Sequence, residues 1–180
     1  QSKSVHLPAG FSADDQSLFV VTDRSGEFRE LQRLQLDTLS LSRVTGHIPW
    51  DVSGGDSSRD GRWLAVRSNE DGLGMLRLFD GQSLTEISLS KLRDLPNGSV
   101  GSIHFRPGSS ELLFSVNGAG GPSQLYTLDT QSQTITPWTQ AAAAPGIDAS
   151  QFARQQIVRW PSFDGLSISG LLTQPPAKFT

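Results

Sequence analysis

Short apolar segments, bounded by turn residues, follow one another through most of the chain. The clearest part predicts strands over residues 100–105, 111–116, 124–128 and 134–138, because these segments alternate apolar with polar positions and are rich in β-branched and aromatic residues. The turns between them contain proline, glycine and aspartate. Apolar residues spaced three and four apart, as an amphipathic helix requires, do not recur. The pattern therefore predicts an all-β protein with antiparallel strands.

The strands belong to a repeat whose period is in the forties. Each unit starts with a turn and an apolar strand and later has a short strand that closes on aspartate. Aligning one apolar residue of each unit gives spacings of 45 and 49 residues, and the closing aspartates give 43 and 49. The aligned residues are Leu18, Trp63 and Leu112, and the aspartates are Asp37, Asp80 and Asp129. Such a period is typical of β-propeller blades.

The fold class that we expect is a β-propeller segment of about three four-stranded antiparallel blades, followed by a short linker and a β-hairpin. The blades occupy residues 1–139, divided roughly into 1–46, 47–90 and 98–139. In the first blade we expect strands over residues 18–22, 28–36 and 39–44, with a weak inner strand near 5–7. In the second blade we expect strands over residues 48–52, 62–67, 75–79 and 84–88.

The character of the chain changes after residue 139. Residues 140–156 contain helix formers broken by Pro145-Gly146, and Asp148 and Gln151 are spaced like a capping box, so we expect a linker with one short helical turn. Residues 157–180 begin with two strands around the turn at 162–165, and this hairpin does not follow the blade pattern. We therefore expect a domain boundary near residue 156.

Composition excludes several classes of function. Charged residues make up 18% of the chain and the net charge is -3, which argues against a nucleic-acid or membrane-surface partner. The absence of cysteine excludes disulfides, thiolate nucleophiles and zinc-thiolate sites. The chain begins without methionine or an apolar signal region, so we expect a processed or shortened chain. The sequence leaves the compartment unknown, with the cytoplasm favoured and the periplasm as the alternative.

The sequence offers no candidate catalytic residue, metal ligand or cofactor site. A Gly-x-Ser-x-Gly nucleophile elbow is absent, and His6, His47 and His104 are far apart with no metal-binding spacing. We expect His104, in the inner strand of the third blade, to be structural. The acidic turns lack the ligand pattern of a calcium loop, so their aspartates are expected to stabilise turns.

Charged residues gather where the second strand of a blade turns into the third, so they are expected to lie on one rim. The rim would contact a partner or substrate, or it would be an ordinary solvated surface, and the sequence leaves both readings open. These residues are Arg24, Glu27, Arg29, Glu70 and Asp71.

The blade segments SRDGRWLAVRSNEDG and SQLYTLD, together with VRWPSFDGLSISGLLTQPP, resemble the prolyl oligopeptidase family of serine peptidases, notably its acylaminoacyl-peptidase and dipeptidyl-peptidase-like members. In that family a segment like residues 158–165, continuing through 170–172 to Pro175-Pro176, leaves the propeller and opens the α/β-hydrolase domain. The resemblance covers essentially the whole chain. It implies the C-terminal part of a propeller plus the first hairpin of the hydrolase domain.

The resemblance also implies what this chain does. The oxyanion-hole segment, the nucleophile elbow and the later aspartate and histidine have no counterpart here, so no catalytic residue is carried over and we expect no hydrolase activity from the isolated chain. The implied role is gating, in which the propeller admits short peptides to the active site of a missing hydrolase domain. Open blade faces imply self-association. The alternative is a stand-alone propeller scaffold that binds protein partners, for which the hairpin would have no use.

Overall fold

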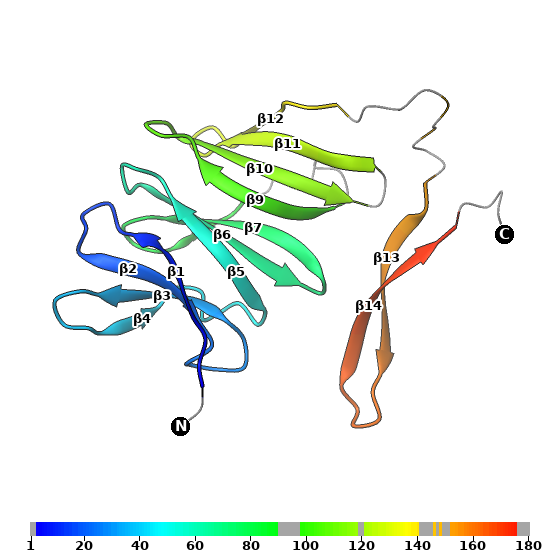
Figure 1. The fold of residues 1–180 in the computed structure, drawn as a ribbon, viewed down its shortest axis with the longest axis horizontal. Coiled ribbons are helices and arrows are strands. Elements are labelled where there is room, and N and C mark those ends of the chain that lie inside the picture. Colours follow the sequence, from blue (N-terminus) through cyan, green and yellow to red (C-terminus); the bar gives the residue numbers. More distant parts are fainter. Residues whose placement is uncertain are drawn as a thin grey trace.

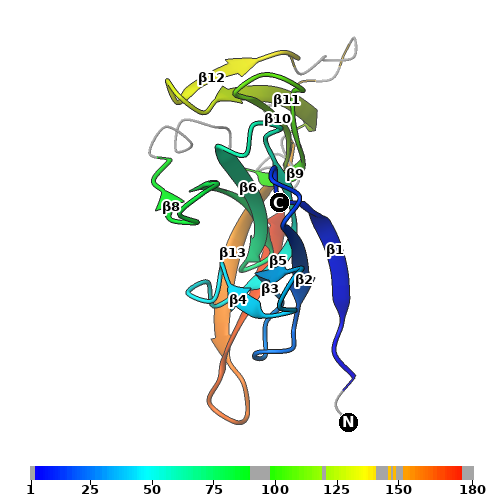
Figure 2. The same cartoon turned by 90° about the vertical axis from the view of Figure 1, so that its left-hand side faces the viewer.

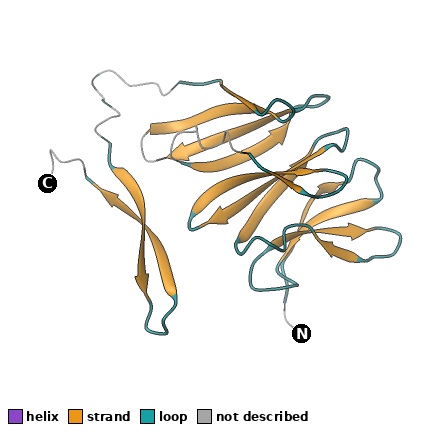
Figure 3. Cartoon of the chain, turned by 180° about the vertical axis from the view of Figure 1, so that it is seen from behind, coloured by secondary structure: helices purple, strands orange, loops and turns teal. Residues whose placement is uncertain are grey.

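The chain is described by a computed structural model, which covers residues 3–89, 98–118, 121–140, 146, 148 and 152–175. Within these residues the structure contains strands, turns and loops but no helix (Figure 3). The strands form three four-stranded sheets and one two-stranded hairpin, and every strand pair is antiparallel. In two perpendicular views the three sheets lie side by side in sequence order (Figures 1 and 2). The predicted fold class is confirmed.

The strand order in each sheet follows the sequence. The first sheet consists of β1 (His6–Phe11), β2 (Ser17–Thr22), β3 (Glu30–Gln35) and β4 (Leu41–Arg43). The middle sheet consists of β5 (Asp51–Ser57), β6 (Trp63–Glu70), β7 (Leu73–Asp80) and β8 (Glu86–Ile87). The third sheet consists of β9 (Ser99–Phe105), β10 (Glu111–Gly118), β11 (Gly121–Asp129) and β12 (Thr134–Pro137). The hairpin consists of β13 (Arg154–Pro161) and β14 (Ser167–Gln174).

Several strand boundaries differ from the predicted ones. The inner strand of the middle sheet begins at Asp51, whereas the sequence suggested Ile48. Ile48 is buried, but its N–H donates to the carbonyl of Thr45 in a turn (2.9 Å), and Pro49 has no N–H for a strand ladder. The outer strands β4 and β8 are shorter than expected, and β10 and β11 extend into the glycine-rich segment. Of the predicted linker, residues 140, 146, 148 and 152–156 are described, so most of the expected helical turn lies outside the described residues. The hairpin begins at Arg154, three residues earlier than predicted, because residues 154–156 pair with residues 172–174.

The alignment of the repeat is also corrected by one residue. Equivalent hydrogen bonds close the turn before the second strand of each sheet, so Leu64, and not Trp63, is equivalent to Leu18 and Leu112. Because a one-residue shift moves a side chain to the opposite face, Trp63 lies on the opposite face of the middle sheet from Leu64. The three hydrogen bonds run from Ser12 N to Ser17 O, from Ser58 N to Trp63 O and from Arg106 N to Glu111 O, each at 2.9 Å.

The aspartates that close the third strands act as turn formers in two of the sheets. Asp80 Oδ1 accepts hydrogen bonds from the N–H groups of the residues two and three positions later (3.1 and 2.7 Å), and Asp129 does the same (2.9 and 2.9 Å). These N–H groups hold the pKa of both carboxyls below its ordinary value. The third predicted member, Asp37, is not equivalent. The register places Gln35 in this position of the first sheet, because Gln35 pairs with Ser17 as Asp80 pairs with Trp63.

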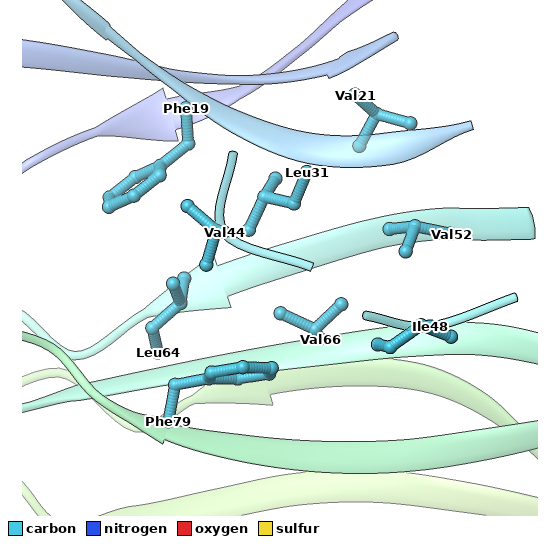
Figure 4. Close-up of a cluster of buried hydrophobic side chains, with 9 residues drawn as sticks. All are labelled: Phe19, Val21, Leu31, Val44, Ile48, Val52, Leu64, Val66 and Phe79. Atoms are coloured by element: carbon cyan, nitrogen blue, oxygen red, sulfur yellow. The ribbon is translucent and has the colours of Figure 1, made fainter. Parts of the chain in front are cut away.

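Each pair of neighbouring sheets encloses an apolar cluster. Between the first and middle sheets, side chains from β2 and β3 meet side chains from β5, β6 and β7 (Figure 4). Between the middle and third sheets, Ala65 and Leu76 meet the strands β9, β10 and β11. Strand β6 therefore contributes to both clusters, with Leu64 and Val66 toward the first sheet and Ala65 toward the third.

The middle and third sheets approach each other closely where β7 passes the start of β9. The N–H of Gly74 donates to the hydroxyl of Ser99 (2.5 Å), and a Cβ atom on Gly74 would collide with the carbonyl oxygen of Val100. Only glycine fits this position without displacing one sheet from the other.

The turn between the third and fourth strands has the same backbone shape in all three sheets. Its fifth residue is left-handed each time, at Leu39 (φ 55°), Leu84 (φ 56°) and Gln133 (φ 54°). None of the three is glycine, asparagine or aspartate, the residues that accept this conformation most readily. A small backbone strain is therefore repeated in every sheet.

Replacing Leu39 by asparagine should stabilise the protein. The Leu39 side chain is 72% exposed, so little packing is lost, while asparagine lowers the cost of the left-handed conformation. We expect Leu39→Asn to raise the free energy of unfolding by about 1 kcal/mol, seen as an increase in Tm of about 3 °C for a chain of this size. The matched control Leu39→Ala keeps a strained residue and should give no such gain. Equal melting of the two variants would contradict the explanation.

Candidate functional site

The turns that join the second and third strands carry the charged residues predicted to form a rim. Residues 23–29 connect β2 to β3, and Asp71 and Gly72 connect β6 to β7. Both turns lie at the same end of their sheets, because Arg29 binds the first residue of β5, which pairs with Asn69 near the end of β6. We call this end of the sheets, made of residues 23–29 and 69–72, the turn face.

Arg29, which precedes β3 of the first sheet, forms hydrogen bonds with β5 of the middle sheet. Its backbone N–H donates to Asp51 Oδ1 (2.8 Å), its guanidinium Nη2 donates to Asp51 Oδ2 (3.1 Å), and its carbonyl accepts from Val52 N (2.7 Å). Burial opposes ionisation of Asp51, but the hydrogen bonds and the charge of Arg29 outweigh it and hold the pKa of this carboxyl below its ordinary value. Arg29 thus has a structural role between two sheets.

Glu70 belongs to a chain of charged groups across the outer part of the middle sheet. Arg77 donates from Nε and Nη2 to Glu70 Oε1 (2.9 and 2.7 Å) and from Nη1 to Glu86 Oε1 (2.6 Å). His47 Nε2 lies 2.7 Å from Glu86 Oε2. Although burial favours its neutral form, hydrogen bonds to both glutamates hold the pKa of Arg77 above its ordinary value. Burial likewise opposes the charge of Glu86, but His47 and Arg77 lower its pKa.

Asp71 is the residue of this face that reaches the hairpin. It occupies the β6–β7 turn in a left-handed conformation (φ 54°) and forms an ion pair with Arg159 of β13. Leu171 of β14 lies against the same turn, since a Cβ atom on Gly72 would be 3.6 Å from its Cδ1. In Figure 1 the hairpin lies beside this end of the middle sheet. Asp71 is therefore the point where the blades meet the part of the chain that follows them.

Arg24 and Glu27 remain on the surface. Both are exposed in the β2–β3 turn, and among the described residues the structure records no side-chain hydrogen bond or ion pair for either. The structure therefore brings three of the five predicted rim residues into contacts and leaves two in solvent. Sequence reasoning missed Arg159, whose signal was a cation between the apolar residues Val158 and Trp160 of a strand.

The hairpin has two unlike faces. The register places Arg159 and Leu171 on the face that meets the middle sheet, and Trp160 on the opposite face. The Trp160 ring packs directly on Gly170, where a Cβ atom would lie only 2.7 Å from its Cη2. Large apolar side chains remain exposed on this second face or at the tip: Trp160 (47%), Phe163 (104%), Leu166 (68%), Ile168 (41%) and Leu172 (38%). Such a patch is typical of a surface that another part of a protein covers.

The histidines lie apart from one another in the structure. His6 Nδ1 is 3.0 Å from the Thr22 hydroxyl, His47 binds Glu86, and His104 is exposed on β9. In the described part of the chain, no three histidine, cysteine, aspartate or glutamate side chains gather as metal ligands would. No helix long and apolar enough to cross a membrane occurs among the same residues.

Comparisons with known proteins show the fold. Neither the family models nor the curated proteins include a match to this sequence. Solved structures do match, among them a prolyl endopeptidase studied for the role of inter-domain dynamics in catalysis and specificity, with a TM-score of 0.76 and 10% identity over 97% of this chain and 25% of that one.

Two further matches have the same character. Prolyl oligopeptidase B from Galerina marginata has a TM-score of 0.75 and 12% identity, covering 97% of this chain and 24% of that one. A puromycin-hydrolysing peptidase from Mycobacterium tuberculosis has a TM-score of 0.75 and 17% identity, covering 97% and 26%. The chain thus has the fold of a segment of these peptidases and spans about a quarter of their length. This confirms, at the level of the fold, the resemblance seen in the sequence.

Removing the charge of Glu86 should destabilise the protein in a pH-dependent way. Because the folded state lowers its pKa, Glu86 contributes stability at neutral pH that is lost as the pH falls through the folded-state pKa. The group is partly exposed, so we expect Glu86→Gln to cost only about 0.5 to 1 kcal/mol at pH 7. The difference from wild type should begin to shrink as the pH falls to about 4.3, the ordinary pKa of glutamate, and should disappear below the lowered folded-state pKa. Urea unfolding at several pH values measures it, with Glu27→Gln as the control; a pH-independent difference would contradict the assignment.

Proposed function

We propose that this chain is the C-terminal part of the propeller, plus the first hairpin of the hydrolase domain, of a serine peptidase related to prolyl oligopeptidase and acylaminoacyl-peptidase. Its role in that protein is to gate access to the active site. The observation that carries the proposal is the succession of three blade-like sheets and one hairpin outside the repeat, matched over 97% of the chain by solved peptidases.

The hairpin distinguishes this function from that of a stand-alone scaffold. A two-stranded hairpin is marginally stable by itself, and a pure propeller has no need of one after its last blade. Here β13 and β14 each have an unpaired outer edge among the described strands, and one face exposes Trp160, Ile168 and Leu172. Further strands and helices of a hydrolase domain would pair the edges and cover this face. We propose that the domain boundary, predicted near residue 156, lies just before the start of β13 at Arg154.

The gating role follows from size exclusion. A propeller placed over a buried active site admits short, flexible peptides and excludes folded proteins, and it needs no catalytic group for this. Arg24 and Glu27, which project into solvent from the turn face, are the groups of this segment available to meet a substrate or the neighbouring domain. We propose short peptides, including those with acylated ends, as the substrates of the whole enzyme.

The function is tested by expressing the gene together with the coding sequence downstream of Thr180. We expect the longer product to react with a serine-directed fluorophosphonate at a serine beyond residue 180 and to cleave acyl-amino-acid anilides and short peptides but not folded proteins. Acyl transfer needs an activated nucleophile, a base and oxyanion donors, so the chain of 180 residues alone should neither label nor turn over substrate.

Two results would overturn this proposal. Labelling of a serine within the first 180 residues, lost when that serine is changed to alanine, would make this chain itself an enzyme. A longer product without any reactive serine would favour the scaffold. Replacing the labelled serine by alanine is the matched control, since it should abolish turnover and leave folding unchanged.

We also propose that the isolated chain self-associates through the open face of the third sheet. On this face Leu113 (39% exposed) and Leu125 (40%) lie beside Trp138 (65%), whose indole donates to Thr127 Oγ1 (2.9 Å). The open face of the first sheet also carries an apolar row, because Phe11, Leu18, Leu34 and Leu41 pair with one another across its four strands, and Phe11 is 59% exposed. The third-sheet face of one copy can therefore pack on the apolar row of the first sheet of another copy.

Sedimentation velocity over a range of concentrations measures this association. We expect the double variant Leu113→Ser/Leu125→Ser to shift the equilibrium toward monomer, because it removes two of the exposed apolar side chains of that face. Met75→Ser, a similar loss at an apolar side chain that is 41% exposed on the middle sheet, is the control and should leave the equilibrium unchanged. A wild-type chain that stays monomeric at every concentration would contradict the proposal.

A further inference from the structure

The contact between the hairpin and the middle sheet has a specific chemical basis. Asp71 and Arg159, which form an ion pair, are 88 positions apart in the chain. The side chain of Asp71 is 17% exposed and that of Arg159 is 56% exposed, so the carboxylate is largely shielded while the guanidinium reaches it from solvent. An ion pair with one partly buried member is less screened than a pair in open solvent.

The two adjacent carboxylates at this turn, Glu70 and Asp71, have different partners. Glu70, the adjacent carboxylate, accepts hydrogen bonds from Arg77 of its own sheet and from the Ser68 hydroxyl. The left-handed backbone at Asp71 places this residue at the apex of the turn, a conformation that aspartate and asparagine tolerate better than most residues. The turn thus presents the carboxylate of Asp71, and not that of Glu70, to the hairpin.

The same hairpin face supplies an apolar contact beside the ion pair. Arg159 pairs with Ser169 and Leu171 pairs with Ile157, so Arg159 and Leu171 lie on one face of the hairpin. Leu171 packs on the turn at Gly72, next to Asp71. The opposite face, with Trp160, is left available for other contacts.

We propose that Asp71 and Arg159, with Leu171 against Gly72, form an electrostatic latch that docks the hairpin on the middle sheet. The contact is small, so docking is reversible and depends on ionic strength. The latch fixes how the segment after the blades is oriented relative to them. It concerns contacts within these 180 residues and does not depend on the proposed peptidase function.

Distance measurements between two spin labels test the latch in the chain itself. The sequence has no cysteine, so Gln82→Cys on the middle sheet and Phe163→Cys at the hairpin tip give two unique labelling sites, both exposed. Electron paramagnetic resonance then reports the distance distribution between sheet and hairpin. We expect one narrow distribution at low salt and a broad one in 1 M salt, where the screening length falls to about 3 Å.

Charge-removing variants make the test specific. Asp71→Asn, which suits the left-handed backbone, and Arg159→Gln should each broaden the distribution at low salt and increase the undocked fraction about two- to fivefold. The double variant should be no broader than either single variant, because both remove the same interaction. Glu27→Gln and Arg24→Gln remove matched charges from the same face and should behave as wild type. Circular dichroism confirms that each variant keeps its sheets.

Three outcomes would overturn the latch. A distribution already broad in the wild type at low salt would mean that the hairpin is not docked. Narrow distributions in Asp71→Asn and Arg159→Gln would assign docking to other groups. Effects of the two variants that add in the double variant would show that the residues act separately.

Discussion

The structure depends on the packing of the middle sheet between its two neighbours. Strand β6 is the centre of this arrangement, since alternate side chains enter the cluster with the first sheet and the cluster with the third. A sheet that is apolar on both faces has no stable existence in water by itself, so each sheet requires the next one. These two clusters hold the turn face in place. Arg29 and Asp51 then fix the first sheet against the middle one at the turn face.

The sequence predicts the architecture well because the repeat is carried by several independent signals. Alternation of apolar residues, turn residues and the period together identify four-stranded sheets, and their order follows from the chain. The residue-by-residue alignment of the three repeats was harder to predict from the sequence. Trp63 is the larger and more obvious apolar residue, yet the hydrogen bond from Ser58 N to Trp63 O shows that Leu64 is the equivalent of Leu18 and Leu112. Asp37 was misaligned for a related reason, since Gln35 provides no carboxylate to mark the position that Asp80 and Asp129 share.

The candidate site was harder to predict because its contacts join residues that are distant in the sequence. The position of the charged turns could be inferred from the strand pattern, and the turns do lie at one end of the sheets. What each residue binds could not be inferred. Arg29, Glu70 and Asp71 belong to the same predicted rim, but the first joins two sheets, the second neutralises an arginine and the third reaches the hairpin. Local sequence patterns predict where in the fold a charged residue lies. Which group its side chain binds depends on how the sheets and the hairpin pack together.

The close approach at Gly74 has a consequence for geometry on a larger scale. In a ring of sheets, the angle between neighbours decides how many sheets complete the circle. The middle and third sheets can come this close because Gly74 has no side chain where it meets Ser99 and Val100. A methyl group there would push the start of β9 outward and change the angle of the wedge. One hydrogen atom in place of a side chain thus helps to set the circumference of any ring to which these three sheets belong.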